Sequence, residues 1–120
     1  MFLQRQMATI LAAVLATIIV IDGDTVRMDG KRYRLLGFDS PETFFAKCER
    51  EREAGYAAAA RLKELIESTD ARLEPTGRNC KWARGCAYLL LNGEDAGDVM
   101  IREGHGAPYT GGRRPNWCGS

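Results

Sequence analysis

Apolar and polar residues alternate along two neighbouring stretches, Thr25–Met28 and residues 31–38, which are separated by Asp29-Gly30. Asp-Gly is a favoured pair for the two-residue type I′ turn, so this pattern predicts a β-hairpin. The second strand must end before Pro41, because proline cannot donate a hydrogen bond within a central ladder.

A helix is predicted over residues 48–67, which are rich in alanine. Its apolar positions fall on one stripe at helical spacing, comprising Ala54, Ala58, Leu62, Leu65 and Ile66. The run of Glu and Arg over residues 49–53 begins the polar face. The helix is therefore expected to cover a sheet with its alanine–leucine stripe.

The rest of the chain predicts shorter elements. These are a strand over 71–74, a polar loop over 75–85, a strand over 86–91 turned by Asn92-Gly93, a helix over 95–103 stopped by Gly104, and an irregular tail over 105–120. About five strands around one long helix predict an α+β fold with a small closed or partly closed barrel.

The N-terminal segment contains fifteen consecutive uncharged residues, 7–21, preceded by Arg5. This run is short for a membrane span, which needs about 20 residues, and it suits a secretory signal cleaved after Ala16. An uncleaved membrane anchor over 7–21 and a core helix feeding a strand are the alternatives. Residues 17–21 are β-branched and predict a strand, so residues 17–120 are expected to form one domain.

The composition is that of an ordinary globular domain, with 45% hydrophobic and 28% charged residues, which excludes a disordered or coiled-coil chain. Lys and Arg number 17 against 16 Asp and Glu, a net charge of +1 that falls to zero if cleavage removes Arg5. A strongly basic nucleic-acid coat is thereby excluded. Any polyanion must bind through a local cluster or a metal ion.

The four cysteines, Cys48, Cys80, Cys86 and Cys118, allow three pairings and are consistent with export. The chain has no Cys-x-x-Cys motif, which disfavours a zinc site. We favour Cys80–Cys86 closing a small loop and Cys48–Cys118 fixing the tail. Four free thiols in a reducing compartment are the alternative.

Two short acidic groups carry candidate chemistry. Asp22 and Asp24 flank a glycine at a bend, and their hard carboxylate oxygens suit calcium or magnesium; an ordinary acidic turn is the alternative. Asp39 and Glu42 flank Ser40-Pro41, which is also the pattern of a helix cap with a capping box. A cap does not explain Arg34, which shares a strand face with apolar residues and is either functional or part of a surface ion pair.

The segment Lys81-Trp82-Ala83-Arg84-Gly85 is the third candidate. Arg84 is either a solvated loop residue or a phosphate ligand, and Trp82 either stacks on a nucleobase or covers the core. His105 is the sole histidine and has no evident catalytic partner.

Together these motifs resemble the staphylococcal-nuclease-like (thermonuclease) family. The resemblance rests on Val20-Ile-Asp-Gly-Asp-Thr-Val26, Tyr33-Arg-Leu-Leu-Gly-Phe-Asp-Ser-Pro-Glu-Thr43, Trp82-Ala-Arg-Gly-Cys-Ala-Tyr88 and Ile101-Arg-Glu-Gly104. Their order and spacing match the family over residues 17–109. The resemblance implies an OB-type five-stranded β-barrel with an inserted helix.

The resemblance also implies roles for particular residues. Asp24, Asp39 and the main-chain carbonyl of Ser40 would bind one Ca²⁺, with Asp22 supporting the metal from outside its ligand set. Glu42 would orient or deprotonate the attacking water, and Arg34 and Arg84 would hold the scissile phosphate.

This chain departs from the family pattern at three places. Ala83 stands where glycine is usual, and it would strain the loop that aims Arg84 if the position needs a positive φ. His105-Gly106 replaces a common Leu-Ala pair. The chain also ends at Ser120 without the long C-terminal helix of the best-known members, as expected for a short subtype with a cysteine-bearing tail.

The expected protein is a secreted or periplasmic monomer without an obligate protein partner. It would hydrolyse DNA and RNA with little sequence preference and leave 3′-phosphate ends, with single strands preferred. A non-catalytic OB-type module that binds nucleic acid or protein is the main alternative, and a membrane-held structural domain of the cell envelope is another. Degenerate modules typically lose the acidic or arginine positions, all of which are retained here.

Overall fold

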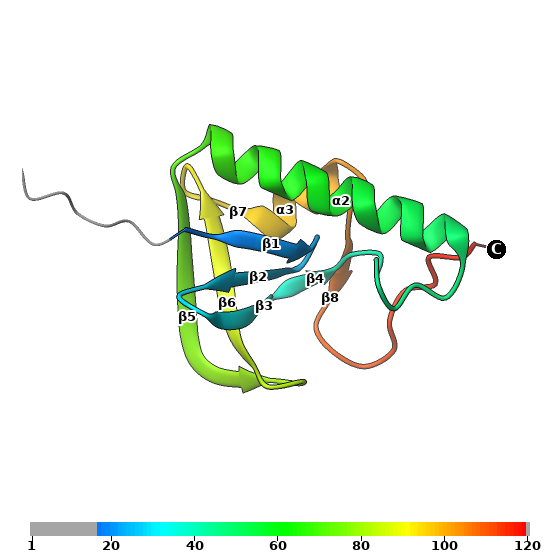
Figure 1. Cartoon of the computed structure of the whole chain (residues 1–120), viewed down its shortest axis with the longest axis horizontal. Helices are drawn as coiled ribbons and strands as arrows, with labels where there is room; N and C mark the ends of the chain where they lie inside the picture. Colours follow the sequence, from blue (N-terminus) through cyan, green and yellow to red (C-terminus); the bar gives the residue numbers. More distant parts are fainter. Residues whose placement is uncertain (1–16, 120) are drawn as a thin grey trace, which may run out of the picture.

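The computed structural model describes residues 17–119, which contain two helices and eight strands (Figure 1). The elements are β1 (Ile19–Asp22), β2 (Thr25–Met28), β3 (Lys31–Leu35), β4 (Gly37–Asp39), α2 (Glu49–Ser68), β5 (Ala71–Cys80), β6 (Arg84–Leu91), β7 (Glu94–Asp95), α3 (Ala96–Arg102) and β8 (Ala107–Tyr109). The predicted α+β class is therefore confirmed.

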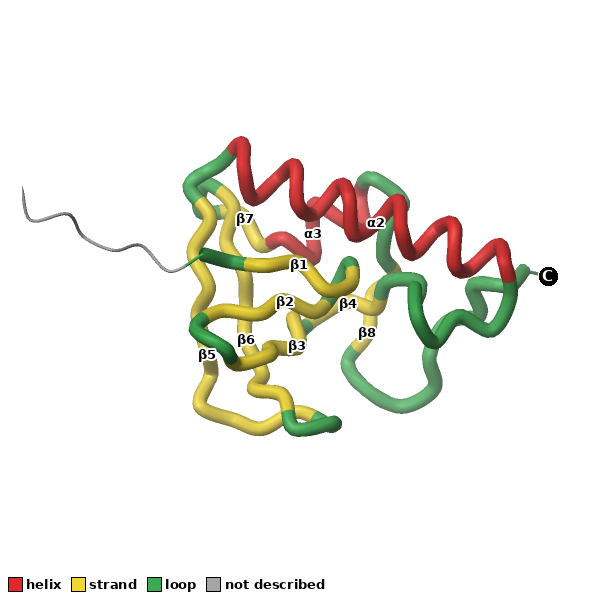
Figure 2. The backbone as a smooth tube through the Cα atoms, in the orientation of Figure 1, coloured by secondary structure: helices red, strands yellow, loops and turns green. Residues whose placement is uncertain are grey.

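The strands form two sheets, which Figure 2 shows as yellow segments. The larger sheet has the order β1-β2-β3-β6-β5, with β7 paired to β6, and is mixed because β3 and β6 are parallel. The smaller sheet pairs β4 with β8. The described strands thus do not close into one continuous barrel.

The predicted hairpin is confirmed, but its second strand is divided. Asp29 and Gly30 have φ values of 53° and 76°, as a type I′ turn requires. The strand predicted over 31–38 instead ends at Leu35, and Gly37 then adopts a φ of 93°. This bend redirects the chain into β4, so that Asp39 leaves the larger sheet.

Helix α2 lies across one side of the sheets (Figure 1). Cys48 caps it by accepting a hydrogen bond from the Glu51 amide, and Ala58, Leu62 and Leu65 of the predicted stripe are buried. Glu51 is also buried, although it was expected on the polar face. Gly55 is also buried, and only glycine fits there, because a Cβ would overlap the Glu42 carbonyl oxygen. The helix therefore contacts the 42–47 segment closely.

The core lies between α2, the larger sheet and α3. It contains Val26, Leu35, Phe38, Ala58, Leu62, Leu65, Leu89, Leu91, Ala96, Val99 and Met100. Helix α3 begins at the Asp95 cap, and the chain leaves it at Gly104 with a φ of 83°, as predicted for a glycine stop.

The prediction of a polar loop over residues 75–85 is wrong. Strand β5 continues to Cys80 and pairs with β6 on both sides of an irregularity between Pro75 and Asn79. Because β5 is an edge strand, Pro75 costs no central ladder bond. The tail is likewise not wholly irregular, since it contributes β8.

Both favoured disulfides are confirmed, Cys80–Cys86 and Cys48–Cys118, and no cysteine of the chain is free. Cys80–Cys86 closes the turn between β5 and β6, whereas Cys48–Cys118 joins the start of α2 to the tail across 70 residues. In the chain-entropy picture the longer loop contributes more to stability, about 4 kcal/mol against about 2.

The proposed leader over residues 1–16 lies outside the described residues. Strand β1 begins at Ile19, within the β-branched segment 17–21 that was expected to form a strand. No helix within residues 17–119 is both long and apolar enough to span a membrane.

Candidate active site

The two acidic motifs meet at one end of the larger sheet. Asp24 lies in the turn between β1 and β2, and Asp39 ends β4. The Ser40 amide donates a 2.9 Å hydrogen bond to Asp24 Oδ2. Both aspartates are nearly inaccessible to water. The alternative reading of Asp39 as a helix cap is wrong, because no helix begins at this position.

Arg34 joins the two aspartates. Its Nη1 lies 3.3 Å from Asp24 Oδ2 and its Nη2 lies 3.4 Å from Asp39 Oδ1. Only 13% of the Arg34 side chain is exposed, and Nη1 also donates to the Leu35 carbonyl at 2.8 Å. The alternative of a solvent-exposed surface ion pair is therefore wrong. The guanidinium is held by charge-assisted bonds in a fixed orientation.

Asp22 and Glu42 stand beside this pair. The Thr43 hydroxyl donates a 2.6 Å hydrogen bond to Asp22 Oδ1 and so fixes the chain just after Glu42. Burial, together with the charges of Asp22 and Asp24, raises the pKa of Glu42 to about 7. Burial also raises the pKa of Asp24, although the Arg34 charge opposes this shift. Burial and the neighbouring carboxylates therefore both disfavour the charged form of Glu42.

The raised pKa of Glu42 predicts a pH dependence of stability in the absence of divalent cations. An unfolded glutamate loses its proton near 4.5, whereas folded Glu42 keeps its proton to about 7. The folded state binds more protons between these values, so the free energy of unfolding should fall as pH rises through them. The full shift corresponds to about 3 kcal/mol, which solvent screening of the partly exposed Glu42 reduces to about 1–2 kcal/mol. Urea melts in chelator should show this slope. Glu42→Gln should remove most of this slope, the rest coming from the raised pKa of Asp24, whereas Glu67→Gln on the exposed side of α2 should leave it unchanged. An unchanged slope in Glu42→Gln contradicts the assignment.

Arg84 is the first residue of β6, and β6 lies next to β3. Its Nη1 donates to the Thr25 hydroxyl at 3.2 Å, and its Nε donates to the Lys81 carbonyl at 2.8 Å. Burial and the neighbouring Arg34 charge lower the pKa of Arg84. Two guanidiniums are thus held at the same end of the sheet as the acidic motifs, despite their mutual repulsion.

Ala83 adopts a φ of 56°, and Trp82 before it adopts a φ of 65°. Both lie in the left-handed region, which is costly for residues with a side chain. Ala83 therefore has the positive φ that was expected to strain the turn before Arg84. Trp82 is 77% exposed and does not cover the core; its carbonyl accepts a hydrogen bond from Arg32.

We therefore expect Ala83→Gly to stabilise the protein by about 1 kcal/mol, because glycine adopts a positive φ without steric cost. If the strain also disturbs Arg84, turnover should rise. Thermal melts measure the first effect. Ala60→Gly, on an exposed turn of α2, is the matched control and should cost about 1 kcal/mol. Destabilisation by both substitutions would contradict the strain.

His105 has no hydrogen bond or ion pair to the acidic motifs among residues 17–119. Gly106 beside it is fixed by packing, since an added Cβ would lie 2.9 Å from the Phe38 ring. A side chain at this position would therefore require the Phe38 ring to shift.

Three residues that contact the acidic motifs were not predicted from the sequence. Arg114 of the tail donates from Nε and Nη2 to Asp39 at 3.0 and 3.2 Å, and Trp117 Nε1 donates to Asp39 Oδ2 at 3.0 Å. The Glu51 carboxylate accepts hydrogen bonds from the amides of Glu42 and Lys47. The spacing of Cys48 and Glu51 is that of a capping box, which was the available signal for Glu51. The Cys48–Cys118 pairing was the signal for Arg114.

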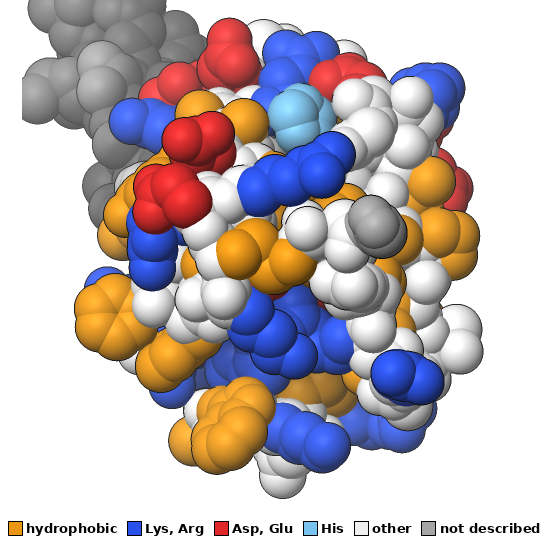
Figure 3. All heavy atoms as spheres, turned by 90° about the vertical axis from the view of Figure 1, so that its right-hand side faces the viewer, with side chains coloured by type: hydrophobic (Ala, Val, Ile, Leu, Met, Phe, Trp, Pro, Cys, Tyr) orange, Lys and Arg blue, Asp and Glu red, His pale blue; other side chains and the backbone are white. Residues whose placement is uncertain are grey.

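Figure 3 looks onto the face that carries the tail and the start of α2. Lys and Arg side chains gather around a hollow in this face, whereas most visible acidic side chains lie toward its upper edge. The chain is nearly neutral overall, so this is a local concentration of positive charge of the kind an anionic ligand requires.

The donor set suits a calcium ion chemically, because Asp24 and Asp39 offer hard oxygen ligands where carboxylates crowd together. No group of three or more His, Cys, Asp or Glu side chains within residues 17–119 is arranged to hold a metal ion. Guanidiniums of Arg34 and Arg114 neutralise the two aspartates instead. The buried Ser40 hydroxyl has no hydrogen-bond partner within residues 17–119.

No protein-family model matches this chain.

Proposed function

We propose that this protein is a calcium-dependent nuclease that hydrolyses phosphodiester bonds of DNA and RNA with low sequence specificity. The observation that carries the proposal is the meeting of Arg34 and Arg84 with Asp24, Asp39 and Glu42 at one end of the sheet. Four separate segments supply these residues. A purely structural ion-pair network gives no reason to hold two half-buried arginines beside each other.

The proposed mechanism assigns binding to the arginines. Their planar guanidiniums would bind the nonbridging oxygens of a phosphodiester, and these bonds would strengthen as charge develops in the transition state. Neither arginine would act as a general acid, because neither loses its proton near neutral pH. Arg34 is already oriented by Asp24 and Asp39, so little ordering is required when the substrate binds.

Glu42 is the proposed general base. It would take a proton from the water whose oxygen attacks phosphorus; the bond from phosphorus to the 5′ oxygen would break, the 5′ oxygen would take a proton from solvent water, and the phosphate would stay on the 3′ side. Calcium, held by Asp24, Asp39 and the Ser40 carbonyl with Asp22 nearby, would screen the phosphate charge and polarise a phosphoryl oxygen. Glu51 fixes the Glu42 backbone through the Glu42 amide and so positions the base.

We further propose that the two sheets and α2 are a variant of the OB-type barrel with an inserted helix. The order of the strands, the helix between β4 and β5, and the parallel contact of β3 with β6 support this relation. The two disulfides support a secreted or periplasmic location, because disulfides persist in oxidising compartments. We also propose that the protein acts as a monomer and prefers single strands of DNA and RNA.

A non-catalytic binding module remains the second candidate, favoured by exposed Trp82 beside Arg32, which offers a surface for base stacking. A 5′-labelled single-stranded oligonucleotide separates the two candidates. We expect cleavage products on a denaturing gel, and Glu42→Gln should bind the oligonucleotide normally in fluorescence anisotropy while failing to cleave it. Binding by both proteins without any cleavage would favour the module.

A further inference from the structure

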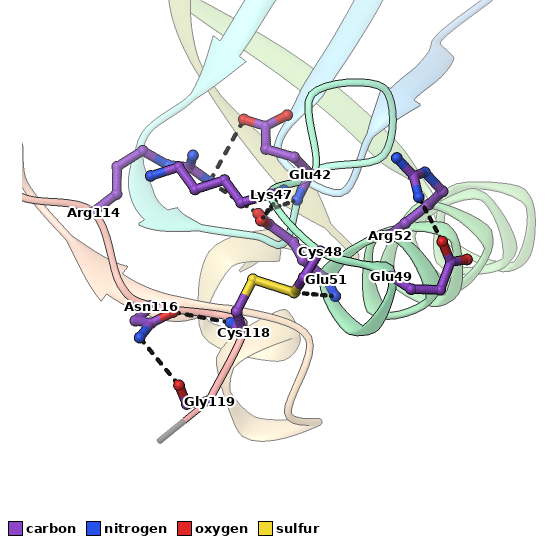
Figure 4. The surroundings of a disulfide bond; sticks show 10 residues. All are labelled: Glu42, Lys47, Cys48, Glu49, Glu51, Arg52, Arg114, Asn116, Cys118 and Gly119. Carbon is purple, nitrogen blue, oxygen red and sulfur yellow. Dashed lines mark hydrogen bonds and ion pairs between the residues drawn. A yellow bond between two sulfur atoms is a disulfide. The ribbon is translucent and has the colours of Figure 1, made fainter.

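The C-terminal tail, residues 110–119, returns to the acidic motifs and inserts a guanidinium among them. Arg114 bonds both oxygens of Asp39, and its Nη2 lies 3.5 Å from Glu42 Oε1 and 3.7 Å from Glu51 Oε2. Figure 4 shows Arg114 pointing toward Glu42 beside the Cys48–Cys118 disulfide. One tail guanidinium thus contacts three carboxylates.

The Asp39 carboxylate has no acceptor position left. Oδ1 receives Arg114 Nε at 3.0 Å and Arg34 Nη2 at 3.4 Å, and Oδ2 receives Arg114 Nη2 at 3.2 Å and Trp117 Nε1 at 3.0 Å. A carboxylate offers about four lone-pair sites. Because Asp39 is 2% exposed, a cation can reach its oxygens only if a donor leaves.

Of the two arginines that contact Asp39, Arg114 is better able to leave. Arg34 has 13% of its side chain exposed and is also held by Asp24 and the Leu35 carbonyl. The Arg114 side chain is 33% exposed, and its hydrogen bonds within residues 17–119 go to Asp39 alone. It comes from a tail segment without regular structure, residues 110–119.

The Cys48–Cys118 disulfide keeps Arg114 near the acidic motifs. Cys118 lies four residues after Arg114, and Cys48 lies three residues before Glu51. A short tether of this kind makes the competitor intramolecular, so its effective concentration is high and independent of solution conditions.

We infer that Arg114 is a tethered cation that competes with calcium for Asp39, so that docking of the tail sets the calcium concentration the site requires. This inference rests on the proposed function. Binding of calcium and docking of Arg114 then oppose each other, and each weakens the other by the same factor. Arg114 would act as a built-in inhibitor of the empty site and move aside when calcium binds.

The competing explanation is that Arg114 only fastens the tail. A fastening role predicts that Arg114→Ala lowers the melting temperature and leaves calcium affinity unchanged. Competition predicts a higher calcium affinity whatever happens to the melting temperature. The two explanations are separated by calcium binding, which needs no nuclease activity as a readout.

Isothermal titration of calcium chloride into the oxidised protein tests the inference on the wild type, Arg114→Ala and Arg113→Ala. Arg113 is exposed and adjacent, and no ion pair to it occurs within residues 17–119, so it controls for the change in net charge. We expect Arg114→Ala to bind calcium at least about fivefold more tightly than the wild type and Arg113→Ala, in the range typical of coupled sites.

Equal affinities, or weaker binding by Arg114→Ala, would overturn the inference and leave the calcium site of the proposed function standing. Absence of calcium binding in every protein would overturn both. If Arg114→Ala does not fold, Cys48→Ser with Cys118→Ser replaces it, because serine keeps the cap of α2 while the tether is removed. This double variant should also bind calcium more tightly, and unchanged affinity in it would overturn the inference.

Discussion

Replacing Arg34 or Arg84 by lysine is expected to lower kcat on single-stranded DNA by at least about a hundredfold. The expected loss is large because a planar two-pronged donor is exchanged for a point charge where charge develops in the transition state. Arg34 bridges Asp24 and Asp39 at 3.3 and 3.4 Å, a geometry that a lysine ammonium cannot reproduce.

Steady-state kinetics on the two variants measure this effect. Arg72→Lys is the matched control, because Arg72 makes only an exposed ion pair with Asp70 on the edge strand β5. The control should cleave at the wild-type rate. Wild-type turnover in Arg34→Lys or Arg84→Lys would remove both arginines from the phosphate clamp and favour the binding module.

The second large effect concerns Asp24 and Asp39. When each is changed singly to asparagine, we expect both variants to lose calcium binding but to differ in how much unfolding free energy they lose. Asp39→Asn removes the charge that pairs with Arg34 and Arg114, leaving two guanidiniums without their shared partner. Breaking a buried ion pair on one side costs about 3–5 kcal/mol. We therefore expect Asp39→Asn to lose both calcium binding and about 3 kcal/mol of unfolding free energy.

Asp24→Asn is expected to lose calcium binding and activity at a smaller cost in stability. An asparagine oxygen can still accept the Ser40 amide bond. Arg34 loses its ion pair with Asp24 but keeps Asp39 and the Leu35 carbonyl, so no guanidinium is left without a partner. Urea melts and calcium titrations on both variants measure the difference. Wild-type calcium affinity in Asp24→Asn would exclude Asp24 as a ligand, and wild-type stability in Asp39→Asn would contradict the ion-pair network.

Local chemistry made much of the fold predictable from the sequence. Asp29-Gly30 and Asn92-Gly93 set their turns through backbone conformation alone, and both pairs have positive φ values. Helix α2 followed from its apolar spacing. These features depend on neighbours close in sequence. The cysteines allowed three pairings, of which the favoured one was confirmed.

Features that depend on partners distant in sequence were missed. Strand β5 extends through Pro75 because β6 pairs with it and no strand of residues 17–119 pairs with its other edge. Neither fact is visible in residues 75–80 themselves. Glu51 is buried because the amides of Glu42 and Lys47 need an acceptor. Arg114 reaches Asp39 across 75 positions of the chain, through a tail whose glycines and prolines carry no periodic signal.

Digestion of heat-denatured DNA by a catalytic amount of the purified protein, with calcium and then with excess chelator, tests the central claim most directly. The Arg84→Lys protein, purified identically, controls for contaminating nuclease. We predict progressive fragmentation by the wild type in calcium, none in chelator, and at most about a hundredth of the rate with Arg84→Lys. Intact DNA in calcium, or equal fragmentation by the wild type and Arg84→Lys, would contradict the assignment of this site to phosphodiester hydrolysis.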